Sequence, residues 1–418
     1  MIHPIKSYGL IALGSIIITS TASVTIANTN QSMIKVDNKP QIQLAQNTST
    51  HYMPQQSIPT VIPEPPKIRL NAAAWVLMDY QTGEILTEKN MNKEHKPASL
   101  TKILAAYVIG QALHDNMIKW GEVVPISKKA WKTPGSKMFI KPSDHLTVGD
   151  LFKGMVISSG NDATVALAEF VAGSEQSFVE LMNHTAKQLG MNHSNFSTSD
   201  GLPAKNQYTS AYDMAILSRA YIHTFPELYK LYSQKSFTFN GITQNNRNRL
   251  LNQKTGVDGI KTGYTDQAGF SLASSQIKDS RRLIAIVLGA PSDTARTEES
   301  NKLLTYGFRF FENYDVADHG KSIAKLRINN AETYQYQLPV AVKNDVVLTL
   351  AKGQDKLIHL NVMANENLKA PIKKDQVVGT LTVTLKGKIL VTTPVYALQS
   401  VEKAGFFTNI GHTIRGWF

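Results

Sequence analysis

The sequence predicts an α+β protein in which a helix-covered sheet precedes a smaller all-β part. Helix-forming segments dominate from about residue 99 to residue 231, and strand-like segments lie before and after them, which predicts one mixed sheet covered by helices. From about residue 317 to residue 397 short alternating strands replace the helices, which predicts a separate all-β domain. The length of 418 residues is ample for both parts.

The first half of the chain supplies a hairpin and several helices. Residues 73–79 and 84–88 read as strands, and the Gln-Thr-Gly turn between them predicts a hairpin. A helix is expected to begin at Ser99, because apolar residues follow it at helical spacing. Residues 151–157 and 163–172 predict two more helices, and Asp162 is placed to cap the second of them.

The second half returns to strands. Lys261 is expected on a strand that opens a β-meander, with further strands at residues 270–277 and 282–288 and a helix at 300–311. In the last part, residues 357–362 and 380–385 alternate apolar and polar side chains, which is typical of half-buried strands.

Three short motifs follow one another along the chain: Ser99-Leu100-Thr101-Lys102, Ser159-Gly160-Asn161 and Lys261-Thr262-Gly263. Ser-x-x-Lys alone is unspecific, since the sequence contains it again at Ser32, Ser275, Ser322 and Ser400, and Lys-Thr-Gly also occurs at Lys254. Context selects among these copies, because Ser99 opens a helix, Ser159 lies between two helices and Lys261 lies on a strand.

Each motif has an ordinary structural explanation when it is taken by itself. Ser99 and Lys102 fit a helix cap with a solvated lysine, Ser159 fits a helix–helix turn, and a lysine on a strand usually faces water. Together, in this order, they predict a nucleophilic serine with a lysine one helical turn away and helix N–H groups near a developing oxyanion. We therefore favour acyl transfer over three coincidences.

Composition excludes several other classes of protein. The sequence has no cysteine, which rules out disulfides, thiolate catalysis and cysteine-bound zinc, and it has no His-Glu-x-x-His motif. The net charge of +12 is dispersed without a dense basic run, so nucleic-acid binding is disfavoured and an anionic lipid or wall polymer is the better partner. No metal and no organic cofactor is expected.

Both ends of the chain suggest export and membrane contact. Residues 1–27 combine a basic start, a short apolar run and small residues, which predicts a signal peptide. Residues 28–67 are polar and rich in Asn, Gln, Ser and Pro, which predicts a flexible leader. From Val401 to Phe418 the apolar residues follow helical spacing, which predicts an amphipathic membrane-anchoring helix, with a helix docked on the protein's own core as the alternative.

The chain resembles the low-molecular-mass penicillin-binding proteins, which are serine-type D-alanyl-D-alanine carboxypeptidases of the penicillin-binding protein five or six kind. The resemblance covers roughly residue 68 to the C-terminus and rests on four segments: residues 97–102, 159–163, 257–263 and 303–312. It implies a transpeptidase/β-lactamase-like catalytic domain over residues 68–314, with an antiparallel sheet covered by helices. It also implies a β-rich domain over 315–397 and an anchoring helix over 398–418.

The resemblance also implies roles for the motif residues. Ser99 would be the nucleophile, Lys102 the general base and Ser159 a proton relay. Substrate contacts would come from Asn161, Lys261, Thr262, Gly263, Tyr264 and Arg296. The substrate would be a peptidoglycan stem peptide, and β-lactam antibiotics would acylate the same serine. Tyr264 stands where some relatives carry a histidine, which leaves the pH optimum and the deacylation rate open.

Three alternatives remain. A D,D-endopeptidase would use the same residues on cross-linked peptides. A class A β-lactamase would need a Glu-x-x-x-Asn sequence, which does not occur between Asn161 and Lys261. A non-catalytic wall-binding role would leave the intact motifs unexplained.

Overall fold

The structure is a computed structural model that describes residues 64–333 and 336–405. The predicted signal peptide at 1–27, nearly all of the polar leader at 28–67 and residues 406–418 of the predicted anchoring helix lie outside the described residues. Over its described part, the helix expected from residue 398 is wrong, because residues 398–405 are not helical and Val401 is buried in the β-rich part, where its backbone pairs with Ile372. Among the residues that the structure does describe, no helix combines the length and the apolarity needed to cross a bilayer.

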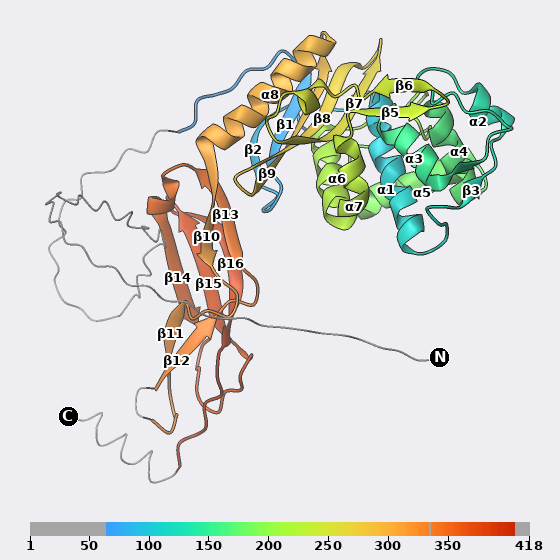
Figure 1. Cartoon of the computed structure of the whole chain (residues 1–418). Helices are drawn as coiled ribbons and strands as arrows, with labels where there is room; N and C mark the ends of the chain where they lie inside the picture. Colours follow the sequence, from blue (N-terminus) through green and yellow to red (C-terminus); the bar gives the residue numbers. More distant parts are fainter. Residues whose placement is uncertain (1–63, 334–335, 406–418) are drawn as a thin grey trace, which may run out of the picture. The chain divides into compact units, whose positions relative to one another are not determined.

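A five-stranded sheet forms the centre of the first, larger part of the described chain (Figure 1). Its order is β2-β1-β9-β8-β7, and each neighbouring pair is antiparallel. The strands are β1 (Ala74–Asp79), β2 (Ile85–Lys89), β7 (Val257–Thr265), β8 (Gly269–Lys278) and β9 (Arg281–Ala290). The antiparallel sheet that the family resemblance implies is thus confirmed. The mixed sheet expected from the order of the elements is wrong, because short turns join β1 to β2 and β7 to β8 to β9, and β1 also pairs antiparallel with β9.

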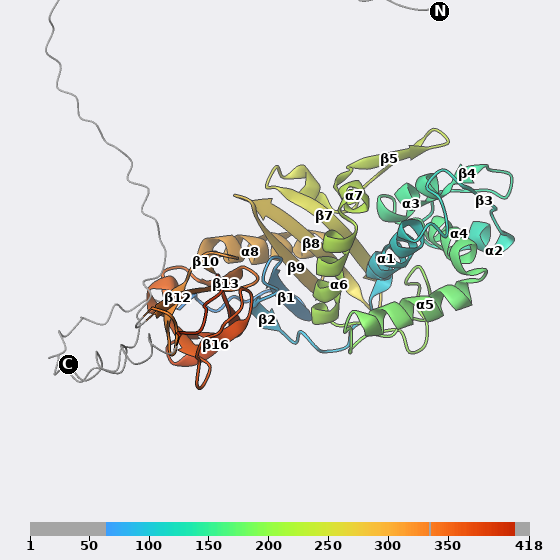
Figure 2. The same cartoon turned by 90° about the horizontal axis from the view of Figure 1, so that it is seen from below.

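Strands β1 and β9 are buried on both faces. Val76 and Met78 of β1 pack into one hydrophobic core, whereas Trp75 and Leu77 pack into another, as the two-residue period of a strand requires. This double burial explains why β1 and β9 read as continuous apolar runs rather than as alternating ones. Helix α8 (Asp293–Phe310) covers the second core, and α6 (Ala211–Thr224) covers the first (Figure 2).

The remaining helices build and cover the first core. They are α1 (Thr101–His114), α2 (Lys128–Lys132), α3 (Val148–Val156), α4 (Asn161–Ala172), α5 (Glu175–Gln188) and α7 (Pro226–Tyr229). Helix α1 is buried on nearly all sides, so it passes through the domain interior and is not amphipathic. Two short hairpins were not predicted, and they pair β3 (Val123–Val124) with β4 (Leu146–Thr147) and β5 (Ser236–Phe239) with β6 (Ile242–Asn245).

Helix boundaries differ from the prediction in two places. Helix α8 begins at Asp293, before the expected residue 300, because the Ser292 side chain accepts a hydrogen bond from the Ala295 N–H and caps it. The N-cap position of α4 is Gly160, so the expectation that Asp162 occupies it is wrong, although the Asp162 carboxylate does accept the N–H of Ala163 in the first turn. Asp162 lies in the first turn, where its carboxylate binds a neighbouring loop.

The second part of the described chain is all-β, as predicted. Its larger sheet has the order β11-β12-β16-β15-β14, and β10 pairs with β13. The strands are β10 (Phe311–Ala317), β11 (Ala324–Ile328), β12 (Tyr336–Ala341), β13 (Val346–Ala351), β14 (Ile358–Ala364), β15 (Val377–Leu385) and β16 (Lys388–Ala397). One face of β14 and β15 supplies Leu360, Leu381 and Val383 to a separate apolar core.

Candidate active site

A cleft of about 760 Å³ lies where the start of α1, the start of α4 and the edge strand β7 meet. Seven of the nine predicted site residues line it, and the other two, Lys102 and Lys261, are buried beside it. The predicted residues in the lining are Ser99, Ser159, Asn161, Thr262, Gly263, Tyr264 and Arg296. Three motifs that are far apart in sequence therefore share one cavity.

Ser99 lies at the entry to α1. It belongs to a short 3-10 turn, Ala98–Leu100, that continues directly into the helix. Lys102 follows within one helical turn, and its Nζ donates a hydrogen bond of 3.1 Å to Ser99 Oγ. This is the distance that a general base needs from the hydroxyl proton it removes.

Lys102 is fully buried, and three acceptors hold its ammonium group. Besides Ser99 Oγ, they are Asn161 Oδ1 at 2.7 Å and the carbonyl oxygen of Asp200 at 2.6 Å. Burial lowers the pKa of Lys102 from 10.5 to about 8, although the negative charge of Asp200 opposes the shift. A substantial neutral fraction therefore exists at mildly alkaline pH, and the neutral amine is the form that accepts a proton.

Two glycines permit the close packing around Ser99. Gly201 has a φ of +87°, and a Cβ there would lie 1.9 Å from the carbonyl oxygen of Ala98. Gly263 brings β7 against the same turn, since a Cβ there would lie 3.0 Å from the Pro97 carbonyl oxygen. Side chains at either position would push the cleft walls apart.

The start of α4 fixes the opposite wall. Asn161 Nδ2 donates to the Pro134 carbonyl oxygen at 2.8 Å, so Asn161 ties this wall to Lys102. The fully buried Asp162 carboxylate accepts the backbone N–H groups of Met138 and Phe139, each at 2.8 Å. An acidic side chain directly after the Ser-x-Asn motif therefore orders the loop that carries Gly135 and Ser136 into the cleft.

Ser159 and Lys261 lie near the cleft without forming a hydrogen bond to Lys102 in the described part of the chain. Ser159 has a φ of +63° and is 2% exposed, and its Oγ makes no hydrogen bond with either lysine within the described part of the chain. Lys261 Nζ donates to the Thr262 carbonyl oxygen at 3.3 Å. Burial, followed by the positive charges of Lys102 and Arg247, holds the pKa of Lys261 well below its usual range.

The outer end of β7 carries the remaining predicted residues. Arg296 Nη1 donates to the Gly263 carbonyl oxygen at 3.1 Å, and the guanidinium also pairs with Asp293. Tyr264 is 49% exposed at the rim, and its ring lies 4.3 Å from that of Phe270. Thr262 and Arg296 therefore place a hydroxyl and a fixed positive charge on the same side of the cleft.

Two functional candidates were missed by the sequence reasoning. Arg247 lines the cleft and lowers the pKa of both buried lysines, yet it lies in a polar loop without periodicity or motif. Asp200 also lines the cleft, and the Asp-Gly pair it forms with Gly201 was a usable turn signal. Within residues 64–333 and 336–405, no three His, Asp or Glu side chains converge as metal ligands would.

Comparisons with known proteins agree with this geometry. Residues 60–292 match the family described as D-alanyl-D-alanine carboxypeptidase, and residues 311–403 match the family described as penicillin-binding protein 5, C-terminal domain. The chain is 44% identical over 349 residues to the D-alanyl-D-alanine carboxypeptidase DacC of Escherichia coli, covering 82% of this chain and 87% of the relative.

A less similar relative and a solved structure also match the chain. Identity to the D-alanyl-D-alanine carboxypeptidase DacF of Bacillus subtilis is 35% over 352 residues, covering 83% of this chain and 90% of the relative. The structure resembles that of penicillin-binding protein 5 from Haemophilus influenzae with a TM-score of 0.74 at 39% identity, covering 81% of this chain and 99% of that chain. The predicted resemblance is thus confirmed, and the chain belongs to the serine-type D-alanyl-D-alanine carboxypeptidases of the penicillin-binding protein 5 group.

Proposed function

We propose that this enzyme removes the terminal D-alanine of peptidoglycan stem pentapeptides through an acyl-enzyme on Ser99. The observation that carries the assignment is the 3.1 Å hydrogen bond between Lys102 Nζ and Ser99 Oγ, combined with a pKa of about 8 for that lysine. A serine hydroxyl is a weak nucleophile until a nearby base takes its proton. Lys102, which its buried setting positions and keeps partly neutral near its pKa of about 8, is that base.

The reaction proceeds in two halves. Neutral Lys102 takes the Ser99 proton while Oγ attacks the carbonyl carbon of the penultimate D-alanine. The C–N bond then breaks, and the departing D-alanine amine receives a proton through Ser159, whose hydroxyl lines the cleft. Water attacks the resulting ester in the second half, with Lys102 again taking the proton, and Ser99 is regenerated.

The oxyanion that forms in each half needs N–H donors. The backbone N–H groups of Ser99 and Tyr264 are our candidates, because both residues line the cleft and Gly263, next to Tyr264, packs against the turn that carries Ser99. Losing one such donor costs about 3–4 kcal/mol of transition-state stabilisation in comparable enzymes. Asn161, which already holds Lys102, is the candidate for orienting the acyl part of the peptide.

The positive end of the cleft suits a substrate that ends in a carboxylate. Thr262 and Arg296 line it, Lys261 is buried behind it, and Arg247 adds a further cation. Guanidinium groups bind carboxylates strongly because they present paired N–H donors. β-Lactams carry an acylating carbonyl and a carboxylate, so the same groups account for their covalent binding.

The activity test uses muropeptides and mass spectrometry. A linear pentapeptide and a cross-linked dimer are incubated with the protein, with Ser99→Ala and with Ser143→Ala, an exposed serine that does not line the cleft. Loss of one alanine from the pentapeptide with the dimer intact is expected for wild type and Ser143→Ala, and no product for Ser99→Ala. Cleavage of the dimer would move the activity to the endopeptidase alternative. Persistent penicillin labelling of Ser99→Ala would remove Ser99 from its role.

We also propose that the enzyme is exported and held at the outer face of the cytoplasmic membrane by residues 406–418, which follow the last described residue of the β-rich part. The support is the amphipathic pattern of that segment and the signal-like residues 1–27. Deleting residues 406–418, which leaves the buried Val401 and its pairing with Ile372 in place, is expected to move the enzyme from the membrane pellet to the soluble fraction. A truncated protein that still pellets with membranes would refute the anchor.

A further inference from the structure

We propose a second ligand site in this enzyme, one that takes an amino sugar bearing a carboxylate. The site is a cavity of about 690 Å³, here called the α6 pocket. It is enclosed by α6, the end of α5, one side chain of α1 and the β1–β2 turn. Its lining includes Tyr80, Gln81, Tyr107, Gln188, Tyr212, Arg219 and His223. Its volume is close to that of the catalytic cleft and lies within the range of small-molecule sites.

The α6 pocket is separate from the catalytic cleft. The two cavities share no lining residue. Tyr107 follows Ser99 by eight residues on the same helical stretch, which at about 1.5 Å per residue places it about 12 Å further along. A ligand in the α6 pocket therefore occupies different space from the peptide that is cut.

Tyr107 is the strongest sign that this cavity is built for a ligand. The residue is only 7% exposed, and its ring packs edge-on against Phe225 at 5.1 Å between centroids. Its hydroxyl has no hydrogen-bond partner among the described residues and, unlike the sealed hydroxyls of Tyr221 and Tyr232, stays accessible at the pocket wall. A buried side chain that opens an unused polar group into a cavity is available to a bound molecule.

More polar groups in the same wall have no internal partner. The side chains of Gln188, Tyr212 and His223 make no hydrogen bond or ion pair within residues 64–333 and 336–405. With Tyr107, they provide three kinds of donor and acceptor around one cavity: hydroxyl, amide and imidazole.

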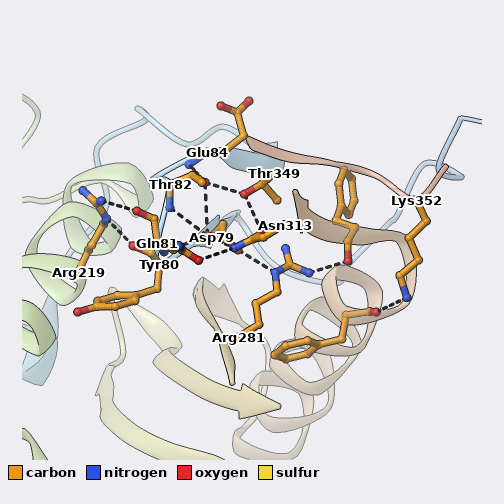
Figure 3. Close-up of polar contacts among 12 residues, drawn as sticks. Asp79, Tyr80, Gln81, Thr82, Glu84, Arg219, Arg281, Asn313, Thr349 and Lys352 are labelled. Atoms are coloured by element: carbon orange, nitrogen blue, oxygen red, sulfur yellow. Dashed lines mark hydrogen bonds and ion pairs between the residues drawn. The ribbon is translucent and has the colours of Figure 1, made fainter. Parts of the chain in front are cut away.

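The wall formed by the β1–β2 turn is rigid. Arg219 donates from Nε to the Tyr80 carbonyl oxygen at 2.7 Å and from Nη2 to the Gln81 carbonyl oxygen at 3.0 Å. On the far side of the turn, the fully buried Asp79 pairs with Arg281 (Figure 3). The turn is thus held from both sides, so the pocket is preformed and ligand binding loses little conformational entropy in ordering it.

The charge of the lining selects the class of ligand. No aspartate or glutamate lines the pocket, and the Arg219 guanidinium keeps its Nη1 without a hydrogen bond in the described structure. A carboxylate is therefore matched at this end. The tyrosine rings offer apolar faces to C–H groups, and the free hydroxyl and amide groups suit sugar hydroxyls and an acetamide. An acidic amino sugar carries all of these features.

The test measures binding to the full chain with the cleft blocked. Ser99 is first acylated with benzylpenicillin and the adduct is verified by intact mass, after which N-acetylmuramic acid is titrated by saturation-transfer NMR. We expect saturable binding, with N-acetylglucosamine, which lacks the carboxylate, bound about ten-fold or more weakly. Tyr107→Phe removes one hydroxyl while keeping the packed ring, and should weaken binding about three- to ten-fold.

The matched control is Tyr396→Phe, which removes a half-buried tyrosine hydroxyl from β16 and should leave binding unchanged. His223→Ala is a second variant, because this exposed residue can be replaced without disturbing the core, and should weaken binding about three-fold. Absence of binding to the acylated protein would overturn the proposal, as would equal affinity for the neutral sugar. Unchanged affinity in both Tyr107→Phe and His223→Ala would also overturn it.

Discussion

The charge of Asp200 should set the pH at which this enzyme becomes active. Its backbone carbonyl accepts a 2.6 Å hydrogen bond from Lys102, and its carboxylate raises the pKa of Lys102 against the effect of burial. Asp162 also raises that pKa, and Arg247 lowers it. Replacing Asp200 by Asn keeps the backbone acceptor and the side-chain size but removes the negative charge. The pKa of Lys102 must then fall.

The magnitude follows from the pKa of about 8 for Lys102. About one tenth of the lysine is neutral at pH 7 and about one hundredth at pH 6, so acylation should fall ten-fold per pH unit on the acid side. Each unit by which Asp200→Asn lowers the pKa of Lys102 gives about ten-fold more neutral base at pH 6, which corresponds to about 1.4 kcal/mol. Burial raises the pKa of Asp200 itself, so the advantage of the variant should shrink at the acid end, where the wild-type carboxyl becomes protonated.

The assay is the second-order rate constant for acylation by benzylpenicillin between about pH 5.5 and pH 9.5. The wild type should show an acid limb with its midpoint near 8, and Asp200→Asn should show the same limb at lower pH. Asp144→Asn, a half-buried acid in a loop outside the cleft, is the control and should match the wild type. A wild-type rate that stays level from pH 6 to pH 9 would refute Lys102 as the base. A limb that moves to higher pH in Asp200→Asn would refute the electrostatic argument.

Three further predictions concern stability, each measured by urea unfolding. Gly201→Ala should lower the free energy of unfolding by more than about 2 kcal/mol and remove most of the activity. Gly190 has a similar positive φ but nothing within 4 Å of an added Cβ, so Gly190→Ala should lower it by only about 1 kcal/mol. Equal losses would contradict the steric explanation. Asp79→Ala should cost about 3–5 kcal/mol because it leaves Arg281 buried without its partner, and a loss below about 1 kcal/mol would show that water replaces the pair. Lys102 binds its proton less tightly in the folded state than in the unfolded state, so the free energy of unfolding should rise with pH between about 8 and 10.5. The rise should reach up to about 3 kcal/mol relative to Lys102→Met. A parallel pH dependence of the two proteins would refute the lowered pKa.

Local sequence signals predicted the parts of the site that depend on local structure. Apolar spacing after Ser99 located the start of a helix, and that start fixes the serine and Lys102 on one face. The turn between residues 79 and 84 was equally readable, because Gln-Thr-Gly separates two short strands. The order of the three motifs then indicated which serine and which lysine belong together.

The missed features depend on tertiary contacts. Asp200 binds Lys102 through its backbone carbonyl, and any residue type has that group, so the sequence does not reveal the contact. Asp162 follows a pattern that suits a helix cap, but its carboxylate binds the N–H groups of a loop 24 residues earlier in the chain as well as the Ala163 N–H of its own helix. Arg247 is one of several polar residues in its loop, and only the folded chain shows which of them turns into the cleft.

The charge balance of the cleft explains why a carboxypeptidase would keep two buried lysines. Burying Lys102 and Lys261 together costs stability, because each ammonium group is desolvated and the charge of Lys102 also disfavours the charged form of Lys261. That same cost lowers the pKa of Lys102 into the range of a working base, while Arg247 and Arg296 keep the cleft positive whichever lysine loses its proton. A substrate that ends in a carboxylate relieves this repulsion when it binds. The binding energy of the terminal D-alanine carboxylate then helps to lower the barrier for cleaving the amide bond next to it. An amide without that carboxylate would enter a cleft whose cations stay unpaired, and it should therefore lose kcat as well as affinity.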